Sequence, residues 1–542
     1  MSRHNGGDLL VEALQAHDVD TAFGIVSVHN LPLVDALAHR LRWVTTRTEA
    51  AAVNAADGYA RARRGVGCAV TSTGTGAGNA AGALVESLTA GSSVLHVTGQ
   101  IDTEYLGQGR GVIHEVPRQA EMLAAVSAAS VLVGDDAAGD LARALLAASS
   151  GPPVPGPVSV EWPIDLQYSE TGPYARSEES GRQAPDPQLL AAAADLIANA
   201  ERPLVWAGGG ACGAASEVDR LLDRIGAGLV TSNAGRGGVP ESDPRVVGNF
   251  GSSVGGADLL AEADLLISIG THFRSNETRT YRLALPERHV QIDADPAALG
   301  RSYPATVPIA GDAATVLGRL LELVLQKGSL AWRERIVETR EAVRAQLRAD
   351  IGPYAAICDS LRRWLPESSP LVRDITIPNS AWGNRLLEVG SPELNIYPRG
   401  GGIGQALGMG IGAAVACPDV PTLVLMGDGG FQVQAGELAT VAQEQLRIVL
   451  VVFDDGGYGV LRNMQDRHLE RRSGVDLVGP DLVRLAEAYG LKGVSVASPE
   501  AFDQAIAAAV AGRAPVMIRV DCEALGPMPV PFVPPVHIPG QD

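Results

Sequence analysis

The feature that most constrains the fold is the order of segments between residues 422 and 463. An apolar run leads into Gly-Asp-Gly-Gly-Phe (427–431), a helical pattern follows, and a second apolar run leads into Asp454 and Asp455. Strand, turn, helix, strand and turn in this order build a parallel sheet and place both turns at one edge of it. We therefore expect Asp428 and Asp455 to lie near each other, although a helix and a strand separate them in the sequence.

Two carboxylates at one sheet edge suit a divalent cation. Mg²⁺ takes a few carboxylate or carbonyl oxygens and leaves its other positions to water and to substrate phosphate. Glycines stand beside both Asp428 and Asp455, and they let the backbone approach a phosphate group closely. Gly-Asp-Gly taken alone is also compatible with an ordinary turn and a solvated aspartate.

The whole constellation resembles the diphosphate-binding signature of thiamine-diphosphate (ThDP) enzymes: Gly-Asp-Gly, an interval of this size, then a polar pair followed by a glycine and commonly an aromatic residue. The resemblance implies that Asp428, Asp455 and the backbone carbonyl of Gly457 hold Mg²⁺. The residues that it assigns to the cofactor in this segment are Asp428, Gly429, Gly430, Asp455, Gly457 and Tyr458. The family usually has Asn-Asn where this chain has Asp454-Asp455, and the extra carboxylate is expected to attract a cation and repel the diphosphate.

Two further segments resemble the same family. Glu49 is followed by small residues and by Ala-Asp-Gly-Tyr-Ala-Arg (56–61), and the resemblance implies that Glu49 contacts ring nitrogen N1′ of the cofactor. A carboxyl group among alanines is expected to be desolvated, with a raised pKa, and able to share a proton with the ring. An isolated glutamate here would instead be read as a helix-dipole carboxylate. In the loop at 399–405, Gly401 is implied to offer its carbonyl to the 4′-amino group, and Ile403 to be the apolar wedge that bends the cofactor.

A chain of 542 residues is too long for one core, and apolar runs alternate with helical patterns along it. We predict an α/β fold of three doubly wound parallel-sheet domains, in the order found in the acetolactate synthase, benzoylformate decarboxylase and benzaldehyde lyase group. The predicted boundaries are 1–165 for a pyrimidine-binding domain, 166–187 for a linker, 188–326 for a middle domain, 327–352 for a connector, 353–526 for a diphosphate-binding domain and 527–542 for a C-terminal tail, which is either a lid or an ordered arm.

The middle domain carries a Gly-x-Gly-x-x-Gly pattern at 208–213 before a helix. The next strand ends at Ser232 and Asn233, with no acid to hold a ribose. In the resembled family this domain binds FAD, an ADP moiety or nothing, so FAD is possible but not indicated.

Proton transfers to a substrate need a group that titrates near neutrality, and the candidates are His29 and His114, each in a strand-end loop. The resemblance implies an enzyme that makes or breaks a C–C bond next to a carbonyl in a 2-oxo acid or 2-hydroxy ketone, as in decarboxylation with carboligation. An acyloin lyase, a simple decarboxylase, a FAD-containing oxidase and a catalytically degenerate ThDP-binding protein remain alternatives. Simple pyruvate decarboxylases have two adjacent histidines in the third strand-end loop, which here is 100–114, and a glutamate where this chain has Leu461. This chain has neither feature, so its sequence favours carboligation or acyloin cleavage.

Composition excludes some partners. The net charge of −19 argues against nucleic acid. The five cysteines show no Cys-x-x-Cys spacing, so neither a zinc site nor a disulfide framework is indicated and a cytoplasmic location is expected. No apolar run approaches the length of a membrane span. Family resemblance suggests a homodimer or homotetramer with active sites shared between chains.

Overall fold

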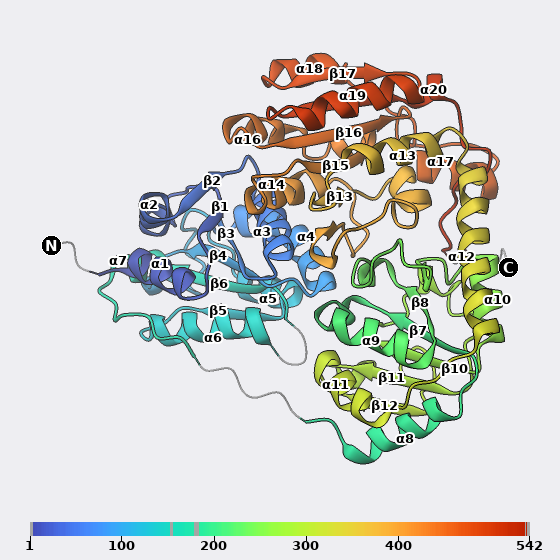
Figure 1. Cartoon of the computed structure of the whole chain (residues 1–542). Helices are drawn as coiled ribbons and strands as arrows, with labels where there is room; N and C mark the ends of the chain where they lie inside the picture. Colours follow the sequence, from blue (N-terminus) through green and yellow to red (C-terminus); the bar gives the residue numbers. More distant parts are fainter. Residues whose placement is uncertain (1–3, 152–154, 178–183, 537, 539–542) are drawn as a thin grey trace.

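The computed structural model describes residues 4–151, 155–177, 184–536 and 538. These residues form three sheets of six strands each, and every strand pair in the three sheets is parallel. Helices cover both faces of each sheet (Figure 1). The predicted α/β fold of three doubly wound parallel sheets is therefore confirmed. Parts of the predicted linker (178–183) and tail (537 and 539–542) lie outside the described residues.

The first sheet has the strand order β2-β1-β3-β4-β6-β5. Its strands are β1 (Thr21–Gly24), β2 (Arg42–Thr45), β3 (Gly67–Thr71), β4 (Val94–Gln100), β5 (Ala129–Leu132) and β6 (Val158–Pro163). Its helices are α1 (Gly6–Ala16), α2 (Leu31–Arg40), α3 (Glu49–Arg63), α4 (Thr75–Ala90), α5 (Gln119–Val126), α6 (Ala137–Ser150) and α7 (Ile164–Tyr168). Strands β3 and β4 are buried along their whole length, as expected for central strands covered on both faces.

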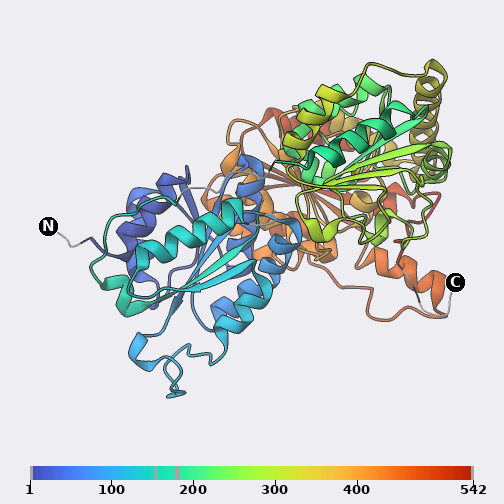
Figure 2. The same ribbon diagram turned by 90° about the horizontal axis from the view of Figure 1, so that it is seen from below.

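The middle sheet has the order β12-β11-β10-β7-β8-β9. Its strands are β7 (Pro203–Ala207), β8 (Gly228–Thr231), β9 (Val246–Gly248), β10 (Leu265–Ile269), β11 (His289–Asp293) and β12 (Val307–Ala310). Its helices are α8 (Pro187–Ala198), α9 (Ala215–Ile225), α10 (Val254–Glu262) and α11 (Ala313–Leu323). The long helix α12 (Leu330–Ile351) then runs along one side of the molecule toward the third domain (Figures 1 and 2).

The third sheet has the order β14-β13-β15-β16-β18-β17. Its strands are β13 (Leu371–Arg373), β14 (Asn395–Ile396), β15 (Thr422–Gly427), β16 (Ile448–Asp454), β17 (Lys492–Val496) and β18 (Val516–Asp521). Its helices are α13 (Tyr354–Trp364), α14 (Ala406–Ala416), α15 (Asp428–Phe431), α16 (Leu438–Gln443), α17 (Gly459–His468), α18 (Leu482–Ala488), α19 (Pro499–Ala511) and α20 (Cys522–Leu525). Counted from the start of each domain, this strand order is the same as that of the first sheet.

The first and third domains meet where α3 packs against α14 (Figure 1). The two backbones approach so closely that a Cβ on Gly58 would overlap the carbonyl oxygen of Met409, and a Cβ on Gly412 would overlap that of Ala55. Glycine is needed at both positions for this approach. The close packing at the glycines of α14 thus joins two domains and places the N-terminal end of α3 beside that of α14.

Candidate active site

Asp428 and Asp455 lie at the carboxyl edge of the third sheet. They follow β15 and β16, which pair in register from Thr422 with Ile448 to Gly427 with Phe453. Asp428 is buried, and burial raises its pKa to about 7, helped by the nearby Asp455 and Asp454 carboxylates. Burial also raises the pKa of Asp455. The two side chains predicted to share an edge are therefore close enough to influence each other.

One oxygen on each of these carboxylates has no partner. Asp428 Oδ1 and Asp455 Oδ1 are buried and form no hydrogen bond within the described residues. A buried, unpaired carboxylate oxygen is costly unless a cation or a proton satisfies it. Carboxylate oxygens are also the ligands that Mg²⁺ prefers, so the residues at this edge fit a divalent cation.

The turn after Asp455 presents a backbone carbonyl to the same place. Gly456 and Gly457 have φ values of 79° and 149°, and Tyr458 donates its N–H to Val475 O at 2.8 Å. A Cβ on Gly429 would stand 2.8 Å from the Tyr458 ring and 3.1 Å from the carbonyl oxygen of Gly457. The Gly457 carbonyl and the Tyr458 ring therefore lie directly against the Gly-Asp-Gly turn.

The loop at 399–405 is held at both ends by buried acids from other segments. Glu86 on α4 accepts the N–H of Gly400 at 2.6 Å, and Asp374 accepts the N–H of Gly404 at 3.1 and 2.8 Å. Between these anchors Gly401 has a φ of 87° and open space around its Cβ position, and the Ile403 side chain is 40% exposed. An exposed isoleucine on an anchored loop suits the wedge role that the resemblance gives it.

Asp374 was not predicted from the sequence. It follows β13 and is completely buried, and burial raises its pKa to about 7, although backbone N–H groups of Gly404 and its neighbours oppose the rise. A Cβ on Gly430 would overlap Asp374 Oδ2, so this carboxyl group also supports the Gly-Asp-Gly turn from below. The only signal in the sequence is an aspartate directly after a buried strand.

Glu49 is the first residue of α3, and it is half-buried. Its Oε2 accepts a hydrogen bond from Asn79 Nδ2 at 3.1 Å. Glu437 of the third domain, another residue that the sequence did not single out, is fully buried and accepts the backbone N–H groups of Arg47 and Thr48 at 3.0 Å each. The start of α3, and with it Glu49, is thereby tied to the third domain.

His29 and His114 lie in contact, although they come from loops after β1 and β4. Their Nδ1 atoms are 3.2 Å apart and their ring centroids 5.2 Å apart. In such a contact one nitrogen donates and the other accepts, so the facing atoms share one proton. Burial lowers the pKa of His29, and the adjacent His114 lowers it further, while Asp102 opposes the shift.

The loop that carries His114 is organised around one carboxylate. Glu115 accepts the N–H groups of Gly109, Gly111 and Val112 at 3.0, 2.8 and 3.1 Å. His114 itself has a φ of 68°, a left-handed conformation that few non-glycine residues adopt. The segment between β4 and α5 extends away from the body of the first domain (Figure 2), so it rests mainly on these internal bonds.

A buried polar network of side chains lies next to the loop that carries His114. Glu161 Oε2 accepts Nε2 of both Gln100 and Gln119 at 2.8 Å, and Gln119 Oε1 accepts the N–H of Gly74 at 2.7 Å. A Cβ on Gly74 would stand 2.5 Å from the carbonyl oxygen of His114. None of these residues belongs to a recognisable motif, so the sequence did not predict their network.

The glycine-rich loop of the middle domain packs against its own domain. The N–H groups of Gly208 and Gly210 donate to the carbonyl oxygens of Ile269 and Gly270 at 2.8 and 3.1 Å. A Cβ on Gly208 would overlap the carbonyl oxygen of Gly270. These two glycines therefore permit close packing of two loops, and their N–H groups are already hydrogen-bonded to backbone carbonyl oxygens.

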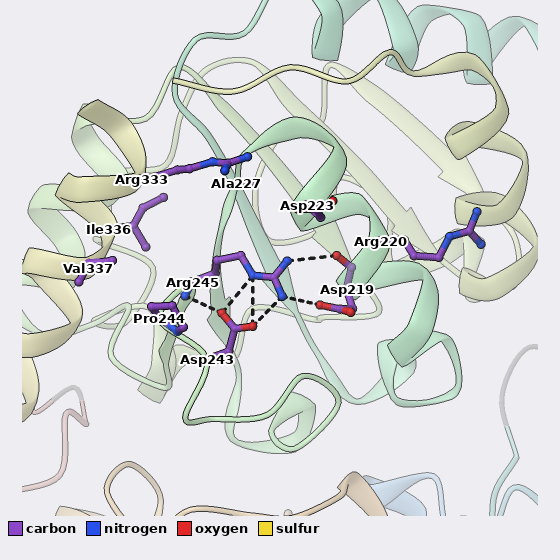
Figure 3. Close-up of a pocket in the computed structure, with 10 residues that line it drawn as sticks. All are labelled: Asp219, Arg220, Asp223, Ala227, Asp243, Pro244, Arg245, Arg333, Ile336 and Val337. Carbon is purple, nitrogen blue, oxygen red and sulfur yellow. Dashed lines mark hydrogen bonds and ion pairs between the residues drawn. The ribbon is translucent and has the colours of Figure 1, made fainter. Parts of the chain in front are cut away.

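One cavity lies apart from this arrangement, and a second borders it. The first, of about 570 Å³, opens on the middle domain, where Arg245 binds Asp243 and Asp219, and Arg220, Asp223 and Arg333 also line its wall (Figure 3). The other, of about 590 Å³, borders Asp455 and is covered by tail residues up to Phe532. Asn463 Nδ2 donates to the Phe532 carbonyl oxygen at 2.9 Å, which ties the tail to α17.

Known proteins match the chain in all three domains. Residues 4–122 match the description "Thiamine pyrophosphate enzyme, N-terminal TPP binding domain", residues 190–320 the central domain and residues 379–520 the C-terminal TPP binding domain. Together with the two acids at the third sheet edge, these matches define a ThDP-dependent enzyme. The chain belongs to the thiamine pyrophosphate enzyme family.

The relatives within that family carry the names of two different activities. The chain is 33% identical to "Probable 2-ketoarginine decarboxylase AruI" of Pseudomonas aeruginosa over 92% of this chain and 90% of that protein. It is 30% identical to "Probable acetolactate synthase large subunit" of Methanocaldococcus jannaschii, covering 98% and 93%. It is 28% identical to "Acetolactate synthase isozyme 2 large subunit" of Escherichia coli, covering 98% of each. None of the helices in the described part of the chain has the length and apolar character that a membrane crossing requires.

Proposed function

We propose that this chain decarboxylates a 2-oxo acid and joins the product to a second carbonyl compound, with ThDP and Mg²⁺ as cofactors. The observation that carries the proposal is the pair of buried oxygens, on Asp428 and Asp455, that have no hydrogen-bond partner within the described residues. Relatives named acetolactate synthase support carboligation as the second half of the reaction.

The residues divide the work between two sheet edges. Asp428, Asp455 and the Gly457 carbonyl hold Mg²⁺, while Gly429, Gly430 and Tyr458 form the surface for the diphosphate. Gly401 and Ile403 orient the organic part of the cofactor from their anchored loop. When bound, ThDP supplies an electron sink for a bond broken next to a carbonyl group. Glu49 holds and moves a proton at ring nitrogen N1′, next to Asn79.

The paired histidines are the acid and base for the substrate. Their facing Nδ1 atoms share one proton, so the pair accepts one further proton at a free ring nitrogen and, once protonated, delivers that proton to the substrate's carbonyl oxygen. The lowered pKa of His29 keeps its ring neutral, and so able to accept a proton, into mildly acidic solution.

The same contact favours a second candidate function, decarboxylation without ligation. No two histidines are adjacent in the third loop of this sequence, which favoured carboligation, yet the fold brings His29 and His114 together from two loops. This spatial pair offers the proton source that aldehyde release requires. The relative named 2-ketoarginine decarboxylase supports this alternative.

A product analysis tests both. Purified protein with ThDP and Mg²⁺ is incubated with 2-oxo acids that carry apolar, polar or cationic side chains, and CO₂, aldehyde and acyloin are measured. The proposal expects CO₂ and acyloin in comparable amounts, and both at least about 100-fold more slowly from a Glu49→Gln control. CO₂ with aldehyde alone would favour the simple decarboxylase, and cleavage of an added acyloin without CO₂ release would favour a lyase. Tight ThDP binding with no product from any substrate would indicate a degenerate binding protein.

We also propose a homodimer or homotetramer in the cytoplasm. Apolar side chains near the histidines are exposed in one chain, among them Val28 at 59% and Ile113 at 67%, as expected for a surface that a second chain covers. All five cysteines are free, as is usual in a reducing compartment. Light scattering measures the mass, and a visible absorption spectrum of the purified protein tests for FAD.

A further inference from the structure

The chain departs from its family at the metal site, and an arginine lies beside each added acid there. Asp454 and Asp455 stand where the family usually has two asparagines. Arg519 Nε lies 2.6 Å from Asp454 Oδ2, and Arg462 Nη1 lies 3.8 Å from Asp455 Oδ1. The oxygen that Arg462 approaches is the one without a hydrogen-bond partner.

Arg462 is held in place by the turn that carries the proposed metal ligands. Its guanidinium group donates to the carbonyl oxygens of Asp455 and Gly456 at 3.0 and 3.2 Å, and to Asp476 Oδ1 at 2.9 Å. Its side chain is only 15% exposed. A guanidinium fixed by three acceptors has lost its rotamer freedom already, so its charge acts on Asp455 from a constant position.

The start of α17 brings this arginine to the acid. A Cβ on Gly459, the first residue of α17, would overlap Asp455 Oδ2, so only glycine lets the helix begin against the carboxylate. Arg462 follows one turn later and therefore reaches back to the turn at 455–457.

Charge at this position acts with opposite signs on the two groups that bind there. A carboxylate in place of an amide draws in the cation and repels the diphosphate, and a nearby guanidinium does the reverse. Arg462 also pairs with Asp476, but that carboxylate is 64% exposed to solvent, so at the buried side of the arginine its charge acts against that of Asp455.

We propose that Arg462 is a positioning and charge-compensating residue of the metal site, which offsets the additional charge of Asp455 so that Mg²⁺ and the diphosphate bind together. The inference rests on the proposed function, because it takes Asp455 as a metal ligand.

The test measures binding, without turnover. Mg²⁺ alone is titrated by calorimetry, and ThDP is titrated at saturating Mg²⁺ by tryptophan fluorescence, for the parent, Arg462→Met, Asp455→Asn and the double variant. Arg462→Met is expected to bind Mg²⁺ about threefold more tightly and ThDP about tenfold more weakly, the size of a coupling between groups in contact. Asp455→Asn is expected to weaken Mg²⁺ binding, and the double variant to return to within about threefold of the parent.

Two further variants separate charge from shape. Arg472→Met removes an arginine that is paired with the exposed Asp466, at 2.7 Å, and is expected to change neither affinity. Arg462→Lys keeps the charge without the planar guanidinium and is expected to bind ThDP nearly as the parent does. If Arg462→Met fails to fold, the ThDP affinity of Arg462→Lys still tests the role of the guanidinium group.

Three results would overturn the inference: Arg462→Met binding ThDP like the parent, Arg462→Lys being as weak as Arg462→Met, or the double variant binding ThDP as weakly as Arg462→Met alone. A parent protein that binds no ThDP in the presence of Mg²⁺ would contradict the proposed function itself, so the two failures are distinguishable.

Discussion

The first and third sheets have the same strand order, yet their carboxyl edges carry different chemistry. The loops after β1 and β4 hold His29 and His114, which contact each other, above a hydrogen-bonded network around Glu161. The equivalent strands of the third sheet, β13 and β16, are followed by Asp374 and Asp455. Each edge leaves a buried carboxylate oxygen without a hydrogen bond, Glu161 Oε1 at the first and Asp428 Oδ1 and Asp455 Oδ1 at the third, but only at the third edge do two such acids lie close enough to influence each other.

The difference shows that strand order places a site and the residues after the strands decide its use. Hydrogen-bonded groups at the first edge are stable without a ligand, and they can hold protons. Unpaired acids at the third edge cost stability until a cation binds them. Changes at the first edge are therefore expected to alter turnover, and changes at the third edge to alter cofactor binding.

Glu49→Gln has the largest expected effect. We expect kcat to fall about 10²- to 10³-fold, as when a positioned acid–base group is lost. The ThDP Kd is expected to change little, because a glutamine carbonyl still accepts the hydrogen bond from Asn79. Steady-state kinetics and a fluorescence titration check both. Equal losses in kcat and in ThDP affinity would contradict the assignment of turnover to the first edge and cofactor binding to the third.

Asp428→Asn is the reciprocal change at the third edge. The ThDP affinity at fixed Mg²⁺ is expected to fall about 100-fold, the upper end of the effects measured around metal sites. Without cofactor, the melting temperature is expected to rise, because a buried unpaired carboxylate is replaced by a neutral amide. Asp466→Asn, at an exposed ion pair with Arg472, is the control and should alter neither value. An apo-protein destabilised by Asp428→Asn would contradict the account of this edge.

Gly412→Ala tests the junction between the two domains. The new methyl group would overlap the Ala55 carbonyl oxygen, so we expect the free energy of unfolding to fall by about 3 kcal/mol, the upper end for overpacking. Gly82 on α4 has open space around its Cβ position, and Gly82→Ala is expected to stabilise the protein by about 0.5–1 kcal/mol. Denaturant unfolding measures both, and similar effects of the two substitutions would refute the close crossing.

His114→Asn has the smallest expected effect on free energy and the most specific signature. The adjacent His114 is the second cause, after burial, of the lowered pKa of His29, so its removal is expected to raise that pKa. Because a higher pKa means that His29 is protonated at higher pH, the acid limb of kcat/KM moves to higher pH. His39→Asn on the exposed part of α2 is the control. If the acid limb does not move, His114 does not influence the pKa of His29.

Pattern and resemblance predicted the three parallel sheets and the shared edge of Asp428 and Asp455, because strand ends in a parallel sheet follow directly from the order of segments. They did not predict Asp374 or Glu437, whose partners are backbone N–H groups of distant segments. The pairing of His29 with His114 escaped notice for a similar reason. Each loop was identified, but their contact depends on a left-handed residue and on a buried network beneath it.

The backbone-to-backbone crossing of α3 and α14 also limits how the enzyme can move. Helices that interlock without intervening side chains cannot slide or hinge past each other without breaking contact. Opening for a substrate must then come from elsewhere, and the segment folded around Glu115 rests on few bonds to the rest of the chain. We therefore expect that segment, with His114 at its end, to be the part that moves when reactants enter.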